Sequence, residues 1–398
     1  MQEREILLIL AVIVILLLFT TRTRNQTKTI KTQLQQKQEQ EQLQSQQEQL
    51  VQSKSASTVY ENAIKSLVTM VTRVGNQYFG GSGFFAVTGN SSLFDINQYL
   101  YLVTAAHIVT DNESLVDDVW IIDNNLNVYK LNSNGVVLLG YDNLADVAFI
   151  RIPRSLTNSN IPHLEFKNSR TELKIGENVN VLGFPLADDV QSITRGIVRD
   201  NKFTNSFYAE SVLTDANTYG GNSGGPGLTD DGKCIGVTSW GLQDSIDGYN
   251  GLSASNHVIP IFERFVSGSG FQKGFLGIRF RNVTPFDIPI RNITTTPMGV
   301  IVLEIVKSSP SLVAAVSVGD IITRVNNVIV GMFNNQSTIF NEIHFKEPNS
   351  TVSLTVMKYN SISNSYGPEQ VFSNVLVQEI DSAQDLVGNN VRKLLKIY

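Results

Sequence analysis

Cysteine is almost absent from this chain, whose 398 residues include only Cys234. A single cysteine excludes an intrachain disulfide and a structural zinc site built from several thiolates, so packing must stabilise the fold. Histidine is also scarce, and its four positions are too far apart to form a paired metal-binding motif: His107, His163, His257 and His344. We therefore expect neither a metal nor another cofactor.

Positive charge is not in excess, because the chain has 31 lysine and arginine residues and 36 aspartate and glutamate residues, which gives a formal net charge of -5. The globular part contains no long lysine or arginine block, so the chain lacks the electrostatic pattern of a nucleic-acid-binding protein. We expect no nucleic-acid partner. With 42% hydrophobic residues, a chain of this length exceeds one core and predicts two folded domains plus non-globular sequence.

Residues 6–19 contain no polar side chain and, extended by Thr20 and Thr21, approach the length that spans the hydrocarbon core of a membrane. A cleaved signal peptide would start with basic residues and end at small ones, whereas acidic residues precede this run and arginines follow it. Residues 1–21 are therefore predicted to be an uncleaved, single-pass membrane anchor. The side of the membrane stays open, since the basic residues after the run favour a cytoplasmic body whereas Asn-X-Ser sequons favour the opposite side.

The sequence on either side of the globular part is simpler. Residues 22–57 are rich in glutamine, lysine, glutamate and serine, a composition typical of a low-complexity linker. Two alternatives are open for it, a disordered or loosely helical stalk and a self-associating coiled coil with Ile30, Leu34, Leu43 and Leu50 in its seam. Residues 381–398 have an apolar helical face and are predicted to form a packing helix.

Between these ends, short apolar or alternating runs are separated by glycine, asparagine and aspartate, a pattern that predicts an all-β domain over residues 58–268. The predicted strands are residues 68–74, 83–87, 99–104, 119–122, 136–139, 147–152 and 179–182. Residues 274–380 are predicted to form a smaller mixed α/β domain, with strands at 299–305, 321–325 and 351–357 and helices at 311–316 and 336–344.

Three short strings carry residue types that support nucleophilic catalysis. Thr104-Ala-Ala-His107 ends an apolar strand, and Asp146 starts another, where a buried carboxylate needs a partner. Gly220-Gly-Asn-Ser223-Gly-Gly-Pro226 encloses a serine between glycines, which permit positive φ and converging backbone N–H groups. Each string has an ordinary alternative when taken alone: a polar histidine, a strand-capping aspartate and a glycine-rich turn.

Taken together, histidine, aspartate and serine follow one another along an all-β chain in the order of the chymotrypsin-type enzymes. This order predicts a catalytic triad in which Ser223 attacks a carbonyl carbon, His107 transfers the proton and Asp146 orients the imidazole. The backbone N–H groups of Gly221 and Ser223 are predicted to form the oxyanion hole.

In these strings the chain resembles the HtrA/Deg family of serine proteases, over about residues 60–380. Gly81-Ser-Gly-Phe-Phe85, Leu182-Gly-Phe-Pro185, Thr194-Arg-Gly-Ile-Val198 and Thr214-Asp-Ala216 are similar to family motifs and follow in family order. The resemblance implies a mainly β protein, with a chymotrypsin-like double β-barrel, an active site between the barrels and a C-terminal PDZ domain. It also implies protein or peptide substrates, especially unfolded or misfolded proteins, and a homo-oligomer, by family habit a trimer.

The second domain resembles the PDZ module of that family through Gly274-Phe-Leu-Gly-Ile278, followed by Gly299-Val-Ile-Val302, Ser309-Pro310 and Gly319-Asp-Ile-Ile322. The resemblance implies that Phe275, Leu276, Gly277 and Ile278 form the peptide-binding loop and strand, beside which a peptide adds as a further strand. One departure is Asn326-Asn327, where the family has Asn-Gly.

Asn222 precedes the nucleophile, at the position where digestive proteases have an aspartate that pairs with an ammonium group released by zymogen cleavage. A neutral residue needs no such counter-charge, so the resemblance favours control by loop rearrangement, oligomerisation or peptide binding to the PDZ domain. The base of the primary specificity pocket is predicted at Asn217, and one wall at Ser239, Trp240 and Gly241. Without an acid at Asn217, we expect an uncharged, aliphatic side chain before the cleaved bond rather than lysine or arginine.

Two alternatives use the same sequence features. A catalytically weak, membrane-tethered PDZ scaffold or chaperone on a protease fold would not need the whole triad, and degradation of unfolded casein would distinguish it from a protease. An esterase or self-processing enzyme would need the same triad and differ in its substrate.

Overall fold

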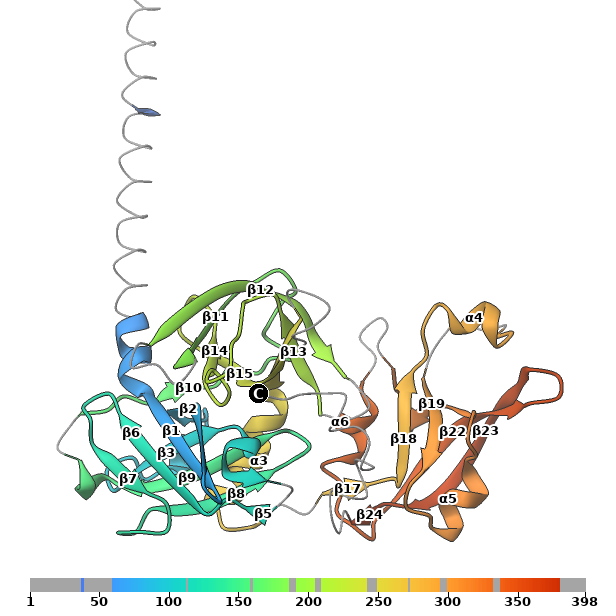
Figure 1. Ribbon diagram of the computed structural model, residues 1–398. Coiled ribbons are helices and arrows are strands. Elements are labelled where there is room, and N and C mark those ends of the chain that lie inside the picture. Colours follow the sequence, from blue (N-terminus) through green and yellow to red (C-terminus); the bar gives the residue numbers. More distant parts are fainter. Residues whose placement is uncertain are drawn as a thin grey trace, which may run out of the picture. The chain divides into compact units, whose positions relative to one another are not determined.

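The computed structural model describes residues 37–38, 59–111, 114–157, 160–185, 191–204, 209–241, 249–270, 273–293, 299–331 and 337–379 (Figure 1). The chain divides into two compact units, Met1–Val59 and Tyr60–Tyr398, and the second contains the β-rich structure. The predicted anchor at residues 1–21, nearly all of the linker at 22–57 and the tail at 381–398 lie outside the described residues. Among the residues with a described structure, no helix has the length and apolarity needed to cross a membrane.

The first half of the protease-like domain is an eight-stranded sheet that follows a helical segment at residues 59–66. Its strands are β1 (Leu67–Val74), β2 (Gln77–Val87), β3 (Tyr99–Thr104), β6 (Asp118–Asp123), β7 (Val128–Lys130), β8 (Val137–Asp142), β9 (Val147–Pro153) and β10 (Leu164–Glu165). They pair in the order β7-β6-β1-β2-β3-β9-β8, with β10 beside β2. Since β7 and β8 do not pair with each other, this half is an open sheet, not the closed barrel that the resemblance implied.

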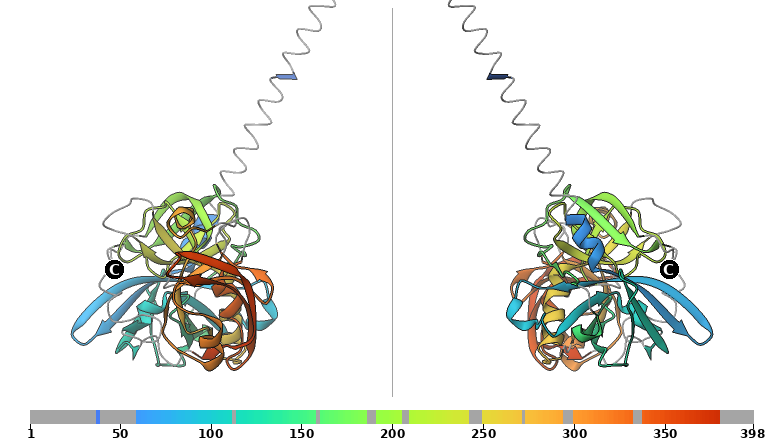
Figure 2. Two further views of the ribbon diagram at one scale, coloured as in Figure 1. Left: turned by 90° about the vertical axis from the view of Figure 1, so that its right-hand side faces the viewer. Right: turned by 90° about the vertical axis from the view of Figure 1, so that its left-hand side faces the viewer.

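Short elements fill the connections of the first sheet: η1 (Ser91–Leu93), α2 (Ala106–Val109), β4 (Thr110–Asp111), β5 (Ser114–Leu115) and η2 (Arg154–Leu156). The hairpin of β1 and β2, in blue, extends beyond the rest of the sheet (Figure 2). Its tip leaves Tyr78 64% and Phe79 51% exposed. The inner ends of the same strands are buried, so the hairpin changes from surface to core along its length.

The second half is a closed barrel in the order β11-β12-β13-β16-β15-β14. Its strands are β11 (Asn178–Gly183), β12 (Ser192–Phe203), β13 (Ser211–Thr214), β14 (Pro226–Leu228), β15 (Cys234–Gly241) and β16 (Asn250–Ala254), and α3 (Ser255–Val266) follows. Glycine is required at position 236 of β15, where this strand lies against β16, because a Cβ on Gly236 would lie 2.6 Å from the Ser253 carbonyl oxygen.

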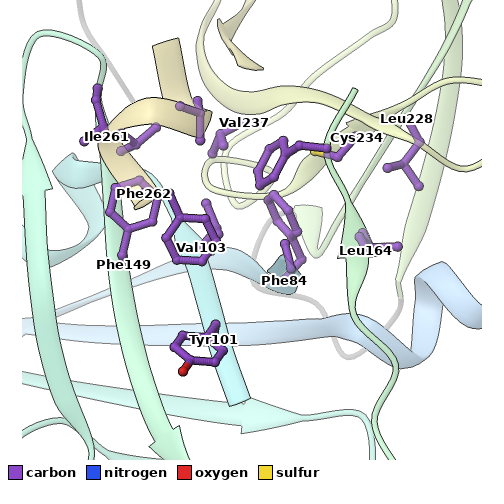
Figure 3. Close-up of a cluster of buried hydrophobic side chains, with 14 of the residues drawn as sticks. Phe84, Tyr101, Val103, Phe149, Leu164, Leu228, Cys234, Val237, Ile261 and Phe262 are labelled. Carbon is purple, nitrogen blue, oxygen red and sulfur yellow. The ribbon is translucent and has the colours of Figure 1, made fainter. Parts of the chain in front are cut away.

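One hydrophobic cluster joins the open sheet to the closed barrel (Figure 3). The sheet contributes Phe84, Val103 and Phe149, and the barrel contributes Leu228, Cys234 and Val237. From α3, Phe262 stacks on Phe149 with 4.6 Å between ring centroids. The two halves therefore share a core, which fixes the position of loops from one half against loops from the other.

The C-terminal domain is a six-stranded sheet with its own hydrophobic core. Its elements are β17 (Gly274–Phe275), β18 (Ile278–Asn282), α4 (Asp287–Ile290), β19 (Val300–Ile305), α5 (Pro310–Ala315), β20 (Ile321–Val325), β21 (Val328–Ile329), α6 (Ile339–Ile343), β22 (Thr351–Asn360), β23 (Ser365–Leu376) and β24 (Gln378–Glu379). The six-stranded sheet has the order β18-β19-β20-β22-β23, with β21 beside β20, and β17 pairs with β24 in a separate two-stranded sheet. Helices α5 and α6 begin at Ser309 and Thr338, whose side chains accept hydrogen bonds from backbone N–H groups.

Candidate active site

His107 and Asp146 are brought together by neighbouring strands of the open sheet. His107 lies in α2, directly after β3, and Asp146 lies in the turn between β8 and β9, while β3 and β9 pair with each other. The imidazole Nδ1 is 2.8 Å from Oδ2 of Asp146, and the His107 backbone N–H donates to Oδ1 at 3.0 Å. Two contacts to one carboxylate fix both the main chain and the ring of the histidine.

The Asp146 carboxylate is held in a tight, buried position. Its backbone has φ +49, a left-handed conformation that costs an L-residue about 1 kcal/mol and is tolerated best by asparagine and aspartate. Burial works to raise the pKa of Asp146, but His107 and a 2.5 Å hydrogen bond from Ser239 outweigh it and lower the pKa below its usual value. The lowered pKa favours the ionised carboxylate, which accepts a hydrogen bond from Nδ1 of His107 when that nitrogen carries the ring proton.

The other ring nitrogen of His107, Nε2, is buried and has no hydrogen-bond partner among the residues that the structure describes. With Nδ1 protonated toward Asp146, Nε2 presents its lone pair and can accept a proton. This is the tautomer that general-base catalysis by His107 requires.

Activity is expected to fall on acidification, with a midpoint above the ordinary histidine value of about 6.5. Burial works to lower the pKa of His107, but the Asp146 carboxylate outweighs it and raises the pKa. Because only neutral imidazole accepts a proton, kcat/KM is lost as the pH falls through this raised pKa. Hydrolysis of a fluorogenic peptide between about pH 5 and about pH 9 would measure the acid limb. A midpoint clearly below the ordinary value would contradict the prediction.

Ser223 lies in the loop between β13 and β14 and is 8% exposed. Its carbonyl oxygen accepts a hydrogen bond from the Ser82 N–H of β2 at 2.8 Å, and the next N–H, of Gly224, donates to the Thr238 carbonyl at 2.8 Å. A Cβ on Gly224 would lie 3.0 Å from the Ala105 nitrogen, two residues before His107. The serine loop of the barrel is thus packed against the histidine segment of the sheet.

The turn before Ser223 has the backbone geometry of an anion-binding loop. The Asn222 N–H donates to the Tyr219 carbonyl at 3.0 Å, and Gly221, the third residue of this turn, has φ +100. These are the features of a type II turn, which favours glycine at that position. Such a turn can aim the N–H groups of Gly221 and Ser223 at one point, as an oxyanion hole requires.

Ser82 fixes this turn and was not among the residues predicted to form the site. Its Oγ donates to the Gly221 carbonyl oxygen at 2.6 Å and accepts from the Phe184 N–H at 2.9 Å. Together with its N–H bond to Ser223, the residue holds the oxyanion loop at two points. The signal in the sequence was its place between two glycines in Gly81-Ser-Gly-Phe-Phe85.

Replacing Ser82 with alanine is expected to lower kcat about tenfold to a hundredfold with little change in KM. The loss of Oγ leaves the Gly221 carbonyl and the Phe184 N–H unsatisfied in a buried place, which costs roughly 1–3 kcal/mol and loosens the oxyanion loop. Steady-state hydrolysis of a fluorogenic peptide would measure it, with the exposed Ser92→Ala variant as the matched control. Equal kcat in the two variants would contradict this role for Ser82.

Asn222 is fully buried, and neither polar atom of its side chain has a hydrogen-bond partner among the described residues. A Cβ on Gly183 would lie 2.9 Å from its Oδ1, so the amide is closely enclosed. An ionised carboxylate at this position would need a cation in a space this tight, whereas the neutral amide does not.

The residues predicted to form the specificity pocket have different environments. Asn217 is exposed, and its carbonyl accepts a hydrogen bond from Thr194 at 2.5 Å, whereas Trp240 is buried beside Phe203. Ser239 donates to Asp146, so it also orients the Asp146 carboxylate. Gly241 ends β15, and a Cβ there would lie 2.7 Å from the side chain of Asn250.

Asn250 links these pocket segments and was missed by the sequence analysis. Its Nδ2 donates to the Ala216 carbonyl at 2.8 Å, and its Oδ1 accepts from Thr218 at 2.7 Å. The amide on β16 therefore supports both sides of Asn217. A single asparagine in an Asn-rich chain gave no signal of this role.

Of the predicted peptide-binding residues, only Ile278 lies on β18, an edge strand of the C-terminal sheet, whereas Phe275 lies on β17 and pairs with Gln378 of β24. Phe275, Leu276 and Ile278 are buried, while Gly277 has φ +83 and its carbonyl accepts hydrogen bonds from Val306 and Lys307. In the part of the chain described, β18 pairs only with β19, so its other edge has no strand partner. This edge has the unpaired backbone groups that a peptide strand needs.

Comparisons with known proteins agree with both domains. A trypsin-like peptidase domain model matches residues 81–237, and a PDZ domain model matches residues 274–365. The chain is 27% identical over 241 residues to the "Serine protease Do-like HtrA" of Bacillus subtilis, covering 57% of this chain and 51% of that protein. It is 25% identical over 313 residues to a "Probable periplasmic serine endoprotease DegP-like" of Chlamydia pneumoniae, covering 74% of this chain and 58% of the relative.

Solved structures with the same fold cover more of the chain at lower identity. The structure of "HtrA-type protease AlgW with tripeptide" has a TM-score of 0.60 and 18% identity, and the match covers 82% of this chain and 97% of that one. A serine endoprotease from Yersinia pestis has a TM-score of 0.54 and 20% identity over 82% of this chain and 98% of its own. The chain spans only about half the length of the curated relatives that it matches.

Proposed function

We propose that this chain is a serine endopeptidase of the HtrA type acting on protein substrates, because a match to a trypsin-like peptidase domain is followed by a match to a PDZ domain and the relatives include a Do-like HtrA protease. The observation that carries the proposal is the 2.8 Å contact between His107 Nδ1 and an ionised Asp146, which leaves Nε2 without a partner among the described residues, beside the serine loop. A scaffold without activity has no need of a histidine whose Nδ1 contacts a carboxylate and whose Nε2 is left without a partner among the described residues.

The proposed reaction uses each residue of the site. Ser223 Oγ attacks the peptide carbonyl carbon while Nε2 of His107 takes its proton, and the Gly221 and Ser223 N–H groups bind the oxyanion. The imidazolium, stabilised by Asp146, then gives the proton to the leaving amine as the C–N bond breaks. Water, activated by His107 in the same way, hydrolyses the acyl-enzyme and regenerates Ser223.

The test is covalent labelling of the full chain together with degradation of unfolded casein. A fluorophosphonate probe reacts with an activated serine, so mass spectrometry is expected to find the label on Ser223 alone. The rate of casein degradation is expected to fall in proportion to the fraction of chain that is labelled. An esterase would be labelled without degrading casein. No labelling and no degradation would overturn the proposal.

For the bond that is cleaved, we propose a preference for an uncharged aliphatic residue before it. The support is the absence of an acid at Asn217 and the neutral amide of Asn250 behind it. A peptide-library digest analysed by mass spectrometry is expected to show cleavage mainly after valine, alanine, isoleucine or leucine. Dominant cleavage after lysine or arginine would contradict it.

We further propose that a peptide adds to β18, beside Phe275, Leu276, Gly277 and Ile278, and that this binding regulates the protease. Support comes from the free edge of β18 and from the structural neighbour AlgW, which was solved with a tripeptide. Homo-oligomerisation, as a trimer, and the boundaries at residues 58–268 and 274–380 are proposed on the same family resemblance.

Residues 1–21 are proposed as a membrane anchor because of their apolar run, with residues 22–57 as a spacer. The relatives named as periplasmic favour a body on the outer side of the membrane. A protease-protection assay on intact membranes tests both points: the body should resist digestion from the cytoplasmic side and pellet with the membranes.

A further inference from the structure

Asp142 is a second buried carboxylate in the loop that carries Asp146. Asp142 is fully buried, and its Oδ1 accepts hydrogen bonds from the N–H groups of Leu144 and Ala145, both at 2.8 Å. These bonds close the turn that ends at Asp146, whose left-handed backbone directs its carboxylate to His107. Asp142 therefore shapes the loop without touching any reacting atom.

The other oxygen of Asp142, Oδ2, faces residues from beyond the protease domain. It lies 3.4 Å from Nζ of Lys273, in the segment that enters the C-terminal domain, and 3.2 Å from Nε2 of His344, at the end of α6. All three residues belong to the same compact unit, Tyr60–Tyr398.

Lys273 supplies the ammonium group that faces the Asp142 carboxylate. Burial lowers the pKa of His344, and it lowers the pKa of the neighbouring His257 to about 4, which disfavours the charged form of both imidazoles. Burial also works against ionisation of Asp142, but Lys273 above all holds the pKa of that carboxyl well below its usual range. His257 in turn contacts Glu210, which is paired with Arg170, so those charges are matched within the protease domain.

The position of Lys273 depends on the C-terminal domain. The next residue, Gly274, donates its N–H to the His344 carbonyl at 3.1 Å, and a Cβ there would lie 2.3 Å from the Ile343 carbonyl oxygen. The chain therefore passes directly against the end of α6. Phe345, which follows, packs on His257 of α3 with 5.2 Å between ring centroids.

We propose that Asp142 is a positioning residue for Asp146 and that Lys273 is its required counter-ion, so that the catalytic carboxylate is fully ordered only when the end of α6 is docked beside the Asp142 turn. A buried carboxylate that loses its cation is strongly destabilised and moves toward water. Movement of Asp142 breaks its two backbone bonds, and Asp146 then leaves its left-handed conformation and the His107 ring.

The experiment uses the full chain and rests on the proposed protease activity. Lys273→Met is expected to lower kcat about tenfold with KM unchanged, and to shift the acid limb of the pH profile downward because Asp146 no longer raises the pKa of His107. Lys273→Arg should restore kcat. Lys346→Met, which removes an exposed lysine nearby, is the matched control and should leave kcat unchanged.

A double-mutant cycle with Asp142→Asn separates positioning from general destabilisation. The amide keeps the oxygen that accepts both backbone bonds but carries no charge, so Lys273→Met should have no further effect on kcat in this background. A tenfold loss in both backgrounds, or no loss in either, would overturn the inference. Rates are taken per mole of folded chain, measured by circular dichroism. An inactive wild-type chain would instead refute the proposed function itself.

Discussion

Replacement of Ser223 by alanine is expected to lower kcat for peptide hydrolysis by about a millionfold, the size of loss seen when the nucleophile of a serine protease is removed. Without Oγ, the loop that faces His107 loses its nucleophile and no acyl-enzyme can form. Backbone bonds hold that loop, from Ser82 and to Thr238, so the variant should fold normally.

Casein degradation and fluorophosphonate labelling would both measure this loss, with Ser92→Ala as a control for the exchange of a serine hydroxyl. A Ser223→Ala chain that still degraded casein at the wild-type rate would show that another residue is the nucleophile. A folded, inactive variant beside an active control is the expected outcome.

Asp146→Asn is expected to lower kcat by about ten-thousandfold while leaving the fold intact. The amide would donate a hydrogen bond to Nδ1 and so place the ring proton on Nε2, which could then no longer accept the proton of Ser223. Ser239, which donates to that same oxygen of Asp146, would instead accept a hydrogen bond from the amide. The acid limb of kcat/KM should also move to lower pH, because the charge that raises the pKa of His107 is gone.

Asp117→Asn, at a side chain that is 51% exposed, is the matched control and should retain wild-type kcat. Comparison of the pH profiles is the more selective measurement, because a merely unstable variant would lose amplitude without a shift of the midpoint. An unshifted acid limb with a small loss of kcat would mean that Asp146 does not orient His107.

Local patterns predicted the parts of the fold whose strands are strongly apolar. The strands expected at residues 99–104, 147–152 and 321–325 are found at Tyr99–Thr104, Val147–Pro153 and Ile321–Val325. In the closed barrel, only β11 was expected. The other strands include many glycine, serine and threonine residues, as in the Asn250–Ala254 strand, and their burial comes from barrel closure, not from a hydrophobic repeat.

The part of the candidate site that was predictable consists of residues whose side-chain type itself suggests a chemical role. His107, Asp146 and Ser223 could be found by their order, since nucleophile, base and orienting acid are distinct types. Ser82, Asn250 and Lys273 could not, because each acts through a contact between residues distant in sequence: Ser82 with Gly221, Asn250 with Ala216 and Lys273 with Asp142. Such contacts exist only once the sheets have packed.

The division of the catalytic residues between the open sheet and the closed barrel has a consequence for synthesis of the chain. A ribosome releases residues in order, so a nascent chain that has folded its first sheet presents His107 and Asp146 well before Ser223 emerges. The nucleophile meets its base only after β14 to β16 have closed the barrel. If Lys273 is also required, full activity waits until α6 (Ile339–Ile343) has been made. A nascent chain that stops before β14 would then hold the proposed base and its orienting acid without a nucleophile.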